Sequence, residues 1–132
     1  MNNVTWLRVA FWWGVIADAI ETIRMAVPKL FLASTGIELS PDIGFAFGLL
    51  YGVPVMLGWT LILVWADRRP VERKGVLLCL IPVIVAYVVV EIFAISLGIV
   101  APARMMPTFV LQAALLGLCA FSYLASREKL RG

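Results

Sequence analysis

Long apolar runs alternate with short polar segments along the whole chain. Four runs cover roughly residues 9–33, 43–66, 76–100 and 107–126. Each run is long enough for the ~20 residues that cross the hydrocarbon core of a bilayer. Apolar residues are continuous within a run rather than alternating, which favours helices over the strands of a barrel. The pattern therefore predicts an all-α integral membrane protein, residues 1–132, with one transmembrane domain of four helices.

The polar segments between the runs, "STGIELSPD", "DRRPVERKG" and "APARMMP", are short. Short connections place consecutive helices side by side and antiparallel, so we expect an up-down-up-down bundle. In the first segment, Ser40 is the expected N-cap of the second helix and Pro41 its first residue.

Composition supports the bilayer as the main partner of the chain. Hydrophobic residues make up 63% and charged residues 14%, and a soluble domain of 132 residues cannot bury so much apolar surface. The net charge of +3 does not indicate nucleic-acid binding, because most basic residues lie at the ends of the runs. No convincing cleavage site accompanies the first run, so we expect it to be retained.

Lysine and arginine predict the orientation of the helices. With both termini cytoplasmic, the outer side carries only Lys29 and Arg104, and this asymmetry follows the positive-inside rule. The inner side then carries Arg8, Arg68, Arg69, Arg73, Lys74, Arg127, Lys129 and Arg131.

The inventory of reactive side chains is small. The chain has no histidine, and Cys79 and Cys119 lie inside apolar runs without a CxxC motif, which is typical of buried free thiols. We therefore expect no cofactor and no metal site, and any proton chemistry must use carboxylates.

The stretch "GVIADAIETIRMAV" places Asp18, Glu21 and Arg24 inside the first run. Counted from the inner end of the helix at 1.5 Å per residue, they lie about 15, 20 and 24 Å deep. The same count on the third helix places Glu91 about 24 Å deep, level with Arg24. Glu21 and Arg24 are i,i+3 neighbours, and Glu91 can meet Arg24 from another helix.

Ionisable residues inside a membrane are costly and by default indicate a functional site. Three acids against one base would leave about two uncompensated negative charges, so either carboxyls are protonated or a cation enters. The alternative is a salt-bridge cluster that only holds the helices in register. The depth count also places Tyr51 of the second helix and Gln112 of the fourth helix in the outer half. The predicted binding cluster comprises Asp18, Glu21, Arg24, Tyr51, Glu91 and Gln112.

Gly44, Gly48 and Gly52 repeat every four residues on the second helix. Small residues at this spacing let another helix backbone approach closely. The face either packs against a helix of the same chain or forms the seam of a homodimer.

The stretches "GWTLILVWADRRPVERKGVLL" and "WGVIADAIETIRMAVPKLF" resemble a family of small four-helix prokaryotic membrane proteins with no assigned activity. This resemblance supports the four-helix topology and implies nothing about mechanism. We expect a multi-pass protein of the inner (plasma) membrane. Small multidrug-resistance transporters are similar in plan, with a membrane-embedded glutamate on their first helix that Asp18 or Glu21 would replace. The sterol-isomerase and sigma-2-receptor group is also similar in plan, with four helices around buried acids.

These patterns predict a cation- or proton-linked transporter or channel-like protein that acts as an oligomer on a cationic or amphiphilic small ligand. A non-catalytic accessory or ligand-binding subunit is the alternative. A membrane enzyme acting on a lipid-like substrate is the least favoured function, because the sequence shows no nucleophile–base motif and no metal-ligand set.

Overall fold

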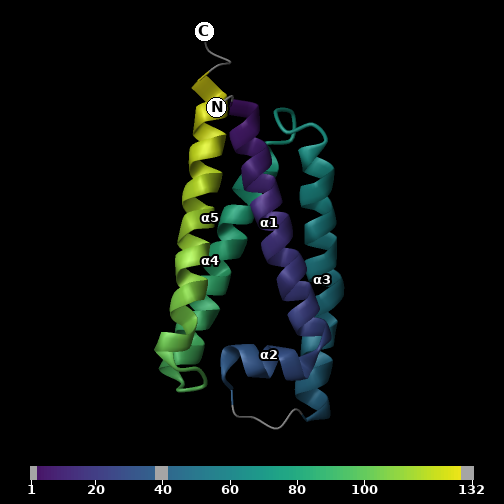
Figure 1. The fold of residues 1–132 in the computed structure, drawn as a ribbon, viewed down its shortest axis with the longest axis vertical. Coiled ribbons are helices and arrows are strands. Elements are labelled where there is room, and N and C mark those ends of the chain that lie inside the picture. Colours follow the sequence, from purple (N-terminus) through teal and green to yellow (C-terminus); the bar gives the residue numbers. More distant parts are fainter. Residues whose placement is uncertain (1–2, 38–41, 129–132) are drawn as a thin grey trace.

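The computed structural model describes residues 3–37 and 42–128, and every regular element in them is a helix (Figure 1). The helices are α1 (Asn3–Ala26), α2 (Pro28–Thr35), α3 (Ile43–Asp67), α4 (Gly75–Ser96) and α5 (Pro102–Glu128). Helices α3, α4 and α5 are each long and apolar enough to cross a membrane. The prediction of an all-α protein is therefore confirmed, and three of its helices are candidate membrane spans.

The predicted single helix over residues 9–33 is wrong, because the chain turns sharply after Ala26. Val27 has φ −122° and ψ 88°, and α2 begins at Pro28. The proline ring disfavours the helical conformation at the residue before it, and proline has no N–H to continue the helical ladder. Helix α2 then runs across the lower end of the other helices (Figure 1). The described residues thus contain five helices, and a four-helix bundle is not confirmed.

The caps around the next connection differ from the prediction. Gly36 ends α2 in the left-handed region at φ 71°, and its N–H donates to the Leu32 carbonyl at 2.9 Å. Helix α3 is capped by Asp42, whose Oδ1 accepts from the Phe45 N–H at 2.6 Å. The predicted cap Ser40, with Pro41, lies outside the described residues, and the helix starts two residues after Pro41.

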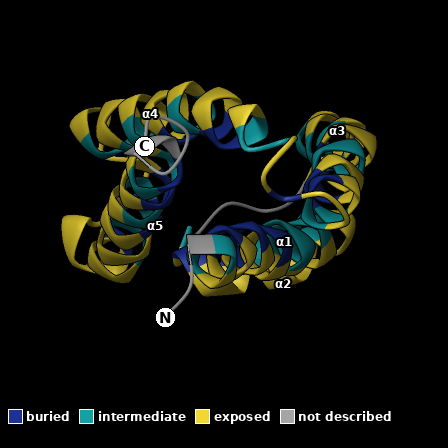
Figure 2. Cartoon of the chain, turned by 90° about the horizontal axis from the view of Figure 1, so that it is seen from above, coloured by how far each residue is buried: buried dark blue, intermediate teal, exposed yellow. Residues whose placement is uncertain are grey.

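The long helices pack in the order α3, α1, α5 and α4, and we call α1 with α3 and α4 with α5 the two helix pairs. Helix α1 packs along α3, helix α4 packs along α5, and the contact between α1 and α5 joins the pairs. Seen from above, α5 lies between α4 and α1, and α3 lies beyond α1 (Figure 2).

The apolar core occupies the half of the molecule that holds both termini, which we call the packed half. At its centre Gly14 lets α1 approach its neighbours closely, since a Cβ there would lie 2.9 Å from Leu63 Cδ1 and 3.6 Å from Leu80 Cδ2. The core draws on all four long helices and consists of Leu7, Ala10, Phe11, Val15, Leu63, Ala66, Leu77, Leu80, Ile84, Leu115 and Cys119.

Polar contacts tie the helices together at the same end. Trp12 Nε1 donates to Asp67 Oδ2 at 3.2 Å and joins α1 to α3. Ser122 Oγ donates to the Trp6 carbonyl at 3.1 Å and joins α5 to α1. The packed half is therefore held by side-chain hydrogen bonds as well as by packing.

The predicted glycine face on α3 divides into two parts. A Cβ at Gly52 would collide with Met25 Cε of α1, so close packing within the chain occurs there. Gly48 has no atom within 4 Å of such a Cβ, and Gly44 has only Asp42 Oδ1 of its own cap nearby at 3.6 Å. The part of the face around Gly48 is open in the monomer.

Candidate functional site

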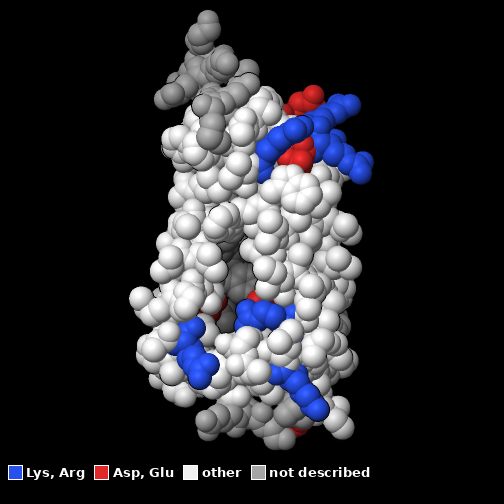
Figure 3. Space-filling view, in the orientation of Figure 1, with Lys and Arg blue, Asp and Glu red and all other residues white. Residues whose placement is uncertain are grey.

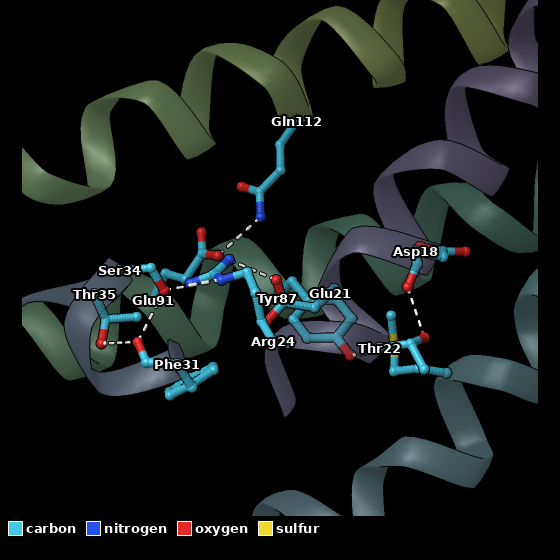
Figure 4. A network of polar contacts seen from close by, with 11 residues as sticks. Asp18, Glu21, Thr22, Arg24, Phe31, Ser34, Thr35, Tyr87, Glu91 and Gln112 are labelled. Carbon is cyan, nitrogen blue, oxygen red and sulfur yellow. Dashed lines mark hydrogen bonds and ion pairs between the residues drawn. The ribbon is translucent and has the colours of Figure 1, made fainter. Parts of the chain in front are cut away.

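The other half of the molecule, which we call the open half, is hollowed on its side. Figure 3 shows a dark hollow between the two helix pairs, with basic and acidic atoms at its lower rim. A close view shows side chains from α1, α2, α4 and α5 pointing toward one another in this region (Figure 4). We call this set the polar cluster, and it comprises Asp18, Glu21, Arg24, Ser34, Tyr87, Glu91 and Gln112.

Arg24 is the centre of the part of the cluster on α1 and α2. Its Nη1 lies 2.6 Å from Glu21 Oε2, so the predicted i,i+3 pair is present. Its Nε donates to Ser34 Oγ at 2.9 Å, and its guanidinium lies 5.4 Å from the centroid of the Phe31 ring. The side chains of Arg24 and Glu21 are 25% and 27% exposed. Arg24 therefore fastens α2 to α1 at the edge of the hollow.

Glu91 has a different partner from the one that the depth count suggested. Gln112 Nε2 of α5 donates to Glu91 Oε1 of α4 at 3.0 Å, which brings two predicted residues together. Within the described residues, no ion pair joins Arg24 to Glu91. Glu91 Oε2 and Gln112 Oε1 are buried and have no hydrogen-bond partner. The pair therefore keeps two free acceptor atoms.

Asp18 lies apart from the rest of the cluster, nearer the packed half (Figure 4). Its backbone carbonyl accepts from Thr22 Oγ1 at 2.7 Å, one turn further along α1. Its Oδ2 is a third buried oxygen without a hydrogen-bond partner. Such atoms are rare in folded proteins, because an unmet acceptor in an apolar setting is costly.

The predicted cluster contains Tyr51, but in the structure Tyr87 lies there instead. Tyr51 is 72% exposed and its ring packs beside Phe47 at 5.9 Å, so it does not join the cluster. Tyr87 of α4 lies in the cluster instead, and its hydroxyl donates to Met56 Sδ of α3 at 3.1 Å. Tyr87 precedes Glu91 by four residues, so helical spacing alone places both on one face.

The bonds of the cluster fall into two groups that follow the helix pairs. Arg24, Glu21 and Ser34 are joined on α1 and α2, whereas Glu91 and Gln112 are joined on α4 and α5. The contact from Tyr87 to Met56 crosses between the pairs. The two groups therefore face each other across the hollow.

The cluster is rich in carboxyl groups and in hydrogen-bond acceptors. It holds three carboxyl groups against one guanidinium, and its unmet oxygens can only accept hydrogen bonds unless a carboxyl carries a proton. Within residues 3–37 and 42–128, no group of three or more His, Cys, Asp or Glu side chains is arranged to hold a metal ion. A ligand that carries positive charge and N–H donors fits this set of atoms.

Comparison with models of known families, with curated proteins and with solved structures finds no match to this chain.

Proposed function

We propose that the polar cluster binds the head group of a cationic amphiphile and that the chain moves this ligand as a transporter-type membrane protein. The observation that carries the proposal is the imbalance of the cluster. Three carboxyl groups accompany one guanidinium, and the buried oxygens without partners are all potential acceptors. Uncompensated negative charge is costly away from water, so a cation or protons must balance it.

The side opening of the hollow supports an amphiphile rather than a wholly polar cation. The core fills the packed half, and α2 lies across the opposite end of the helices (Figure 1). The hollow is visible from the side of the molecule, where apolar helix surfaces would face lipid (Figure 3). A ligand with an apolar tail can enter along the bilayer and bring its charged head to the cluster.

The proposal includes α1 as a fourth span, with both termini cytoplasmic. Its 24 residues extend about 36 Å, and it packs along α3. In a background with both cysteines replaced by serine, Lys29→Cys should react with an impermeant thiol reagent added outside, and Glu72→Cys should not. The reverse labelling pattern would mean that the orientation is inverted.

A homodimer through the open part of the α3 glycine face belongs to the same proposal. A cluster served by so few helices encloses little space, and a second copy packed near Gly48 would enlarge it. Gly48→Leu should then convert a dimer in detergent to a monomer. If wild type and variant have the same mass, the dimer does not form through this face.

Binding is tested with dodecylammonium as the probe and uncharged dodecanol as its matched control. Thermal stability of the protein in nanodiscs should rise with dodecylammonium and not with dodecanol. The variant Asp18→Asn/Glu91→Gln should bind the probe at least about tenfold more weakly, a loss of about 1.4 kcal/mol. Glu72→Gln, which removes an exposed acid far from the hollow, should leave the affinity unchanged.

Two outcomes would refute this function. Equal stabilisation by the charged and uncharged probes would show that charge does not contribute to binding. Full binding by the doubly neutralised variant would show that the cluster is not the binding site. Flux of the probe into liposomes then separates a transporter from a non-transporting ligand-binding subunit. Release of lipid products by the purified protein would instead identify the enzyme alternative.

A further inference from the structure

A second charged surface lies at the end of the packed half, opposite the α2 end (Figure 3). It is formed by the connection between α3 and α4 together with the start of α1. Five basic and two acidic side chains give it a formal charge of +3. We call it the basic rim, and it comprises Arg8, Asp67, Arg68, Arg69, Glu72, Arg73 and Lys74.

The acidic residues of the basic rim are already engaged. Asp67 accepts from Trp12 Nε1 at 3.2 Å, and its side chain is only 19% exposed. Glu72 pairs with Arg69 at 3.2 Å. Asp67 Oδ1 has no hydrogen-bond partner and lies 3.9 Å from Arg8 Nε in a long ion pair, so the two carboxylates leave part of the basic charge unpaired.

Two of the basic residues are turned back onto the protein. The guanidinium of Arg73 lies 3.5 Å from the centroid of the Trp65 ring, and it also donates to the Trp65 carbonyl. Lys74 Nζ donates to the Ser126 carbonyl at 3.2 Å. These contacts stabilise the connection and leave other cations to face outward.

Arg8 and Arg68 are the cations that the fold leaves available, and both adjoin Asp67. The side chain of Arg8 is 58% exposed, and its Nε is 3.9 Å from Asp67 Oδ1, too far for a hydrogen bond. Arg68 is exposed, and within the described residues it makes no ion pair or side-chain hydrogen bond. Arg8, beyond its long ion pair with Asp67, and Arg68, the next residue after Asp67, therefore keep unused donors at this end of the molecule.

Exposed indoles lie at the same end of α1 and α3, where Trp12 shares Asp67 with Arg8. Trp12, Trp13 and Trp65 are 49%, 41% and 50% exposed on α1 and α3. Indoles of this kind are typical of the level of lipid head groups, and apolar helix surface continues beyond them. This continuity favours a lipid over a soluble acidic protein as the partner of the rim.

We infer that Arg8 and Arg68 bind the phosphate of an anionic phospholipid whose acyl chains lie along α1 and α3 beyond the tryptophans. Guanidinium groups suit phosphate because their planar donors bond two oxygens at once. A lipid also brings an apolar part to the exposed indoles, which a soluble anion does not. This inference is independent of the ligand proposed for the hollow.

The test measures retention of phosphatidylglycerol by the full chain in detergent, using native mass spectrometry. Wild type should retain phosphatidylglycerol in preference to phosphatidylcholine. Arg8→Gln/Arg68→Gln should retain it about tenfold less, as loss of charge-assisted contacts predicts. The control variant Lys29→Gln/Arg104→Gln removes the same charge at the opposite end and should behave as wild type. High salt should also weaken retention of phosphatidylglycerol by the wild-type protein, and this measurement needs no variant.

Three results would overturn the inference. Wild type could retain both lipids equally, so that charge plays no part. The Arg8 and Arg68 variant could retain phosphatidylglycerol as well as wild type does. Glycerol 3-phosphate could displace the lipid fully at equal concentration, in which case the rim is a site for soluble phosphate compounds.

Discussion

The packed half and the open half are built from the same four long helices, yet they differ in the side chains at the facing positions and in how closely the helices pack. In the packed half, apolar side chains from α1, α3, α4 and α5 meet in one core. In the open half, the facing positions carry Asp18, Glu21, Arg24 and Glu91, and a hollow separates the helix pairs (Figures 3 and 4). The comparison teaches that the residue type at the facing positions decides whether two helices close upon each other.

Small and apolar residues account for the closure. Helices in lipid gain little from the hydrophobic effect and associate through close packing. Gly14 supplies that packing, because Leu63 and Leu80 fill the space beside it. One turn further along α1, Asp18 introduces a carboxylate whose charge resists burial against bare apolar side chains.

The largest expected loss of stability follows the removal of a buried aromatic ring from the packed half. Phe11 is fully buried, and Phe11→Ala should reduce the free energy of unfolding by about 3 kcal/mol through the cavity that it leaves. Phe93 is 62% exposed on α4, so Phe93→Ala should stay close to wild type. Denaturant unfolding in one detergent measures both variants. Equal losses would mean that the core does not determine stability.

A somewhat smaller effect is expected from overfilling the same half. Gly14→Leu should cost about 2 kcal/mol, because the added side chain must displace Leu63 and Leu80. Gly48→Leu is the matched change at an open position and should have little effect on unfolding of the monomer. If the two variants lose the same stability, then the close approach at Gly14 is not what holds α1 in place.

The ion pair in the open half should contribute less than either core change. A double-mutant cycle of Arg24→Met with Glu21→Gln should give a coupling of about 1 kcal/mol, since both side chains are about a quarter exposed. The cycle of Arg24→Met with Glu91→Gln should give a smaller coupling, because Glu91 is bonded to Gln112 instead. A larger coupling with Glu91 would restore the pairing that depth alone suggests.

The smallest effect on stability is expected from Thr22→Cys. Labelling of its thiol should give the sharpest contrast between the two halves in access to water. Cys119 is buried as predicted, whereas Cys79 is exposed, so the prediction of a buried thiol is wrong there. With Cys79 changed to serine, Thr22→Cys should react with a small water-soluble maleimide, whereas Cys119 should not. Thr22 lies beside the hollow, and its substitution loses one hydrogen bond to the Asp18 carbonyl. Comparable labelling rates, read by mass spectrometry, would show that the two halves are equally closed.

The sequence predicts both ends of α3 and the start of α4 to within one residue, but it misses the break in the first run, the end of α4 and the start of α5. Continuous apolar character over residues 9–33 conceals the break, because hydropathy does not register that Pro28 excludes a helical Val27. The broken helix also conceals Ser34, which reaches Arg24 only because α2 runs across the end of α1.

Depth arithmetic predicts half of the cluster geometry. It groups Glu91 and Gln112 in one layer, and the structure bonds them, but it pairs Glu91 with Arg24, and no ion pair joins those two among the described residues. Depth does not give the direction in which a residue points around its helix. For this reason Tyr51 is expected in the cluster but packs beside Phe47, whereas Tyr87 is not expected there and lies among the cluster residues although it is partly exposed. The binding role of the cluster stays a prediction.

The contact between Tyr87 and Met56 has a mechanical consequence. If the packed half acts as a fulcrum, the part of α1 from Val15 to Arg24 is a lever arm of about 14 Å. A rotation of about 10° would then move Arg24 by about 2 Å relative to Glu91. The Arg24–Glu21 and Glu91–Gln112 bonds would keep their lengths, since each lies within one helix pair. The hydroxyl–thioether contact and the approach of Arg104 to Gly36 would yield first. Sulfur is a weak acceptor, so the packed half is expected to stay rigid while the two helix pairs separate easily in the open half.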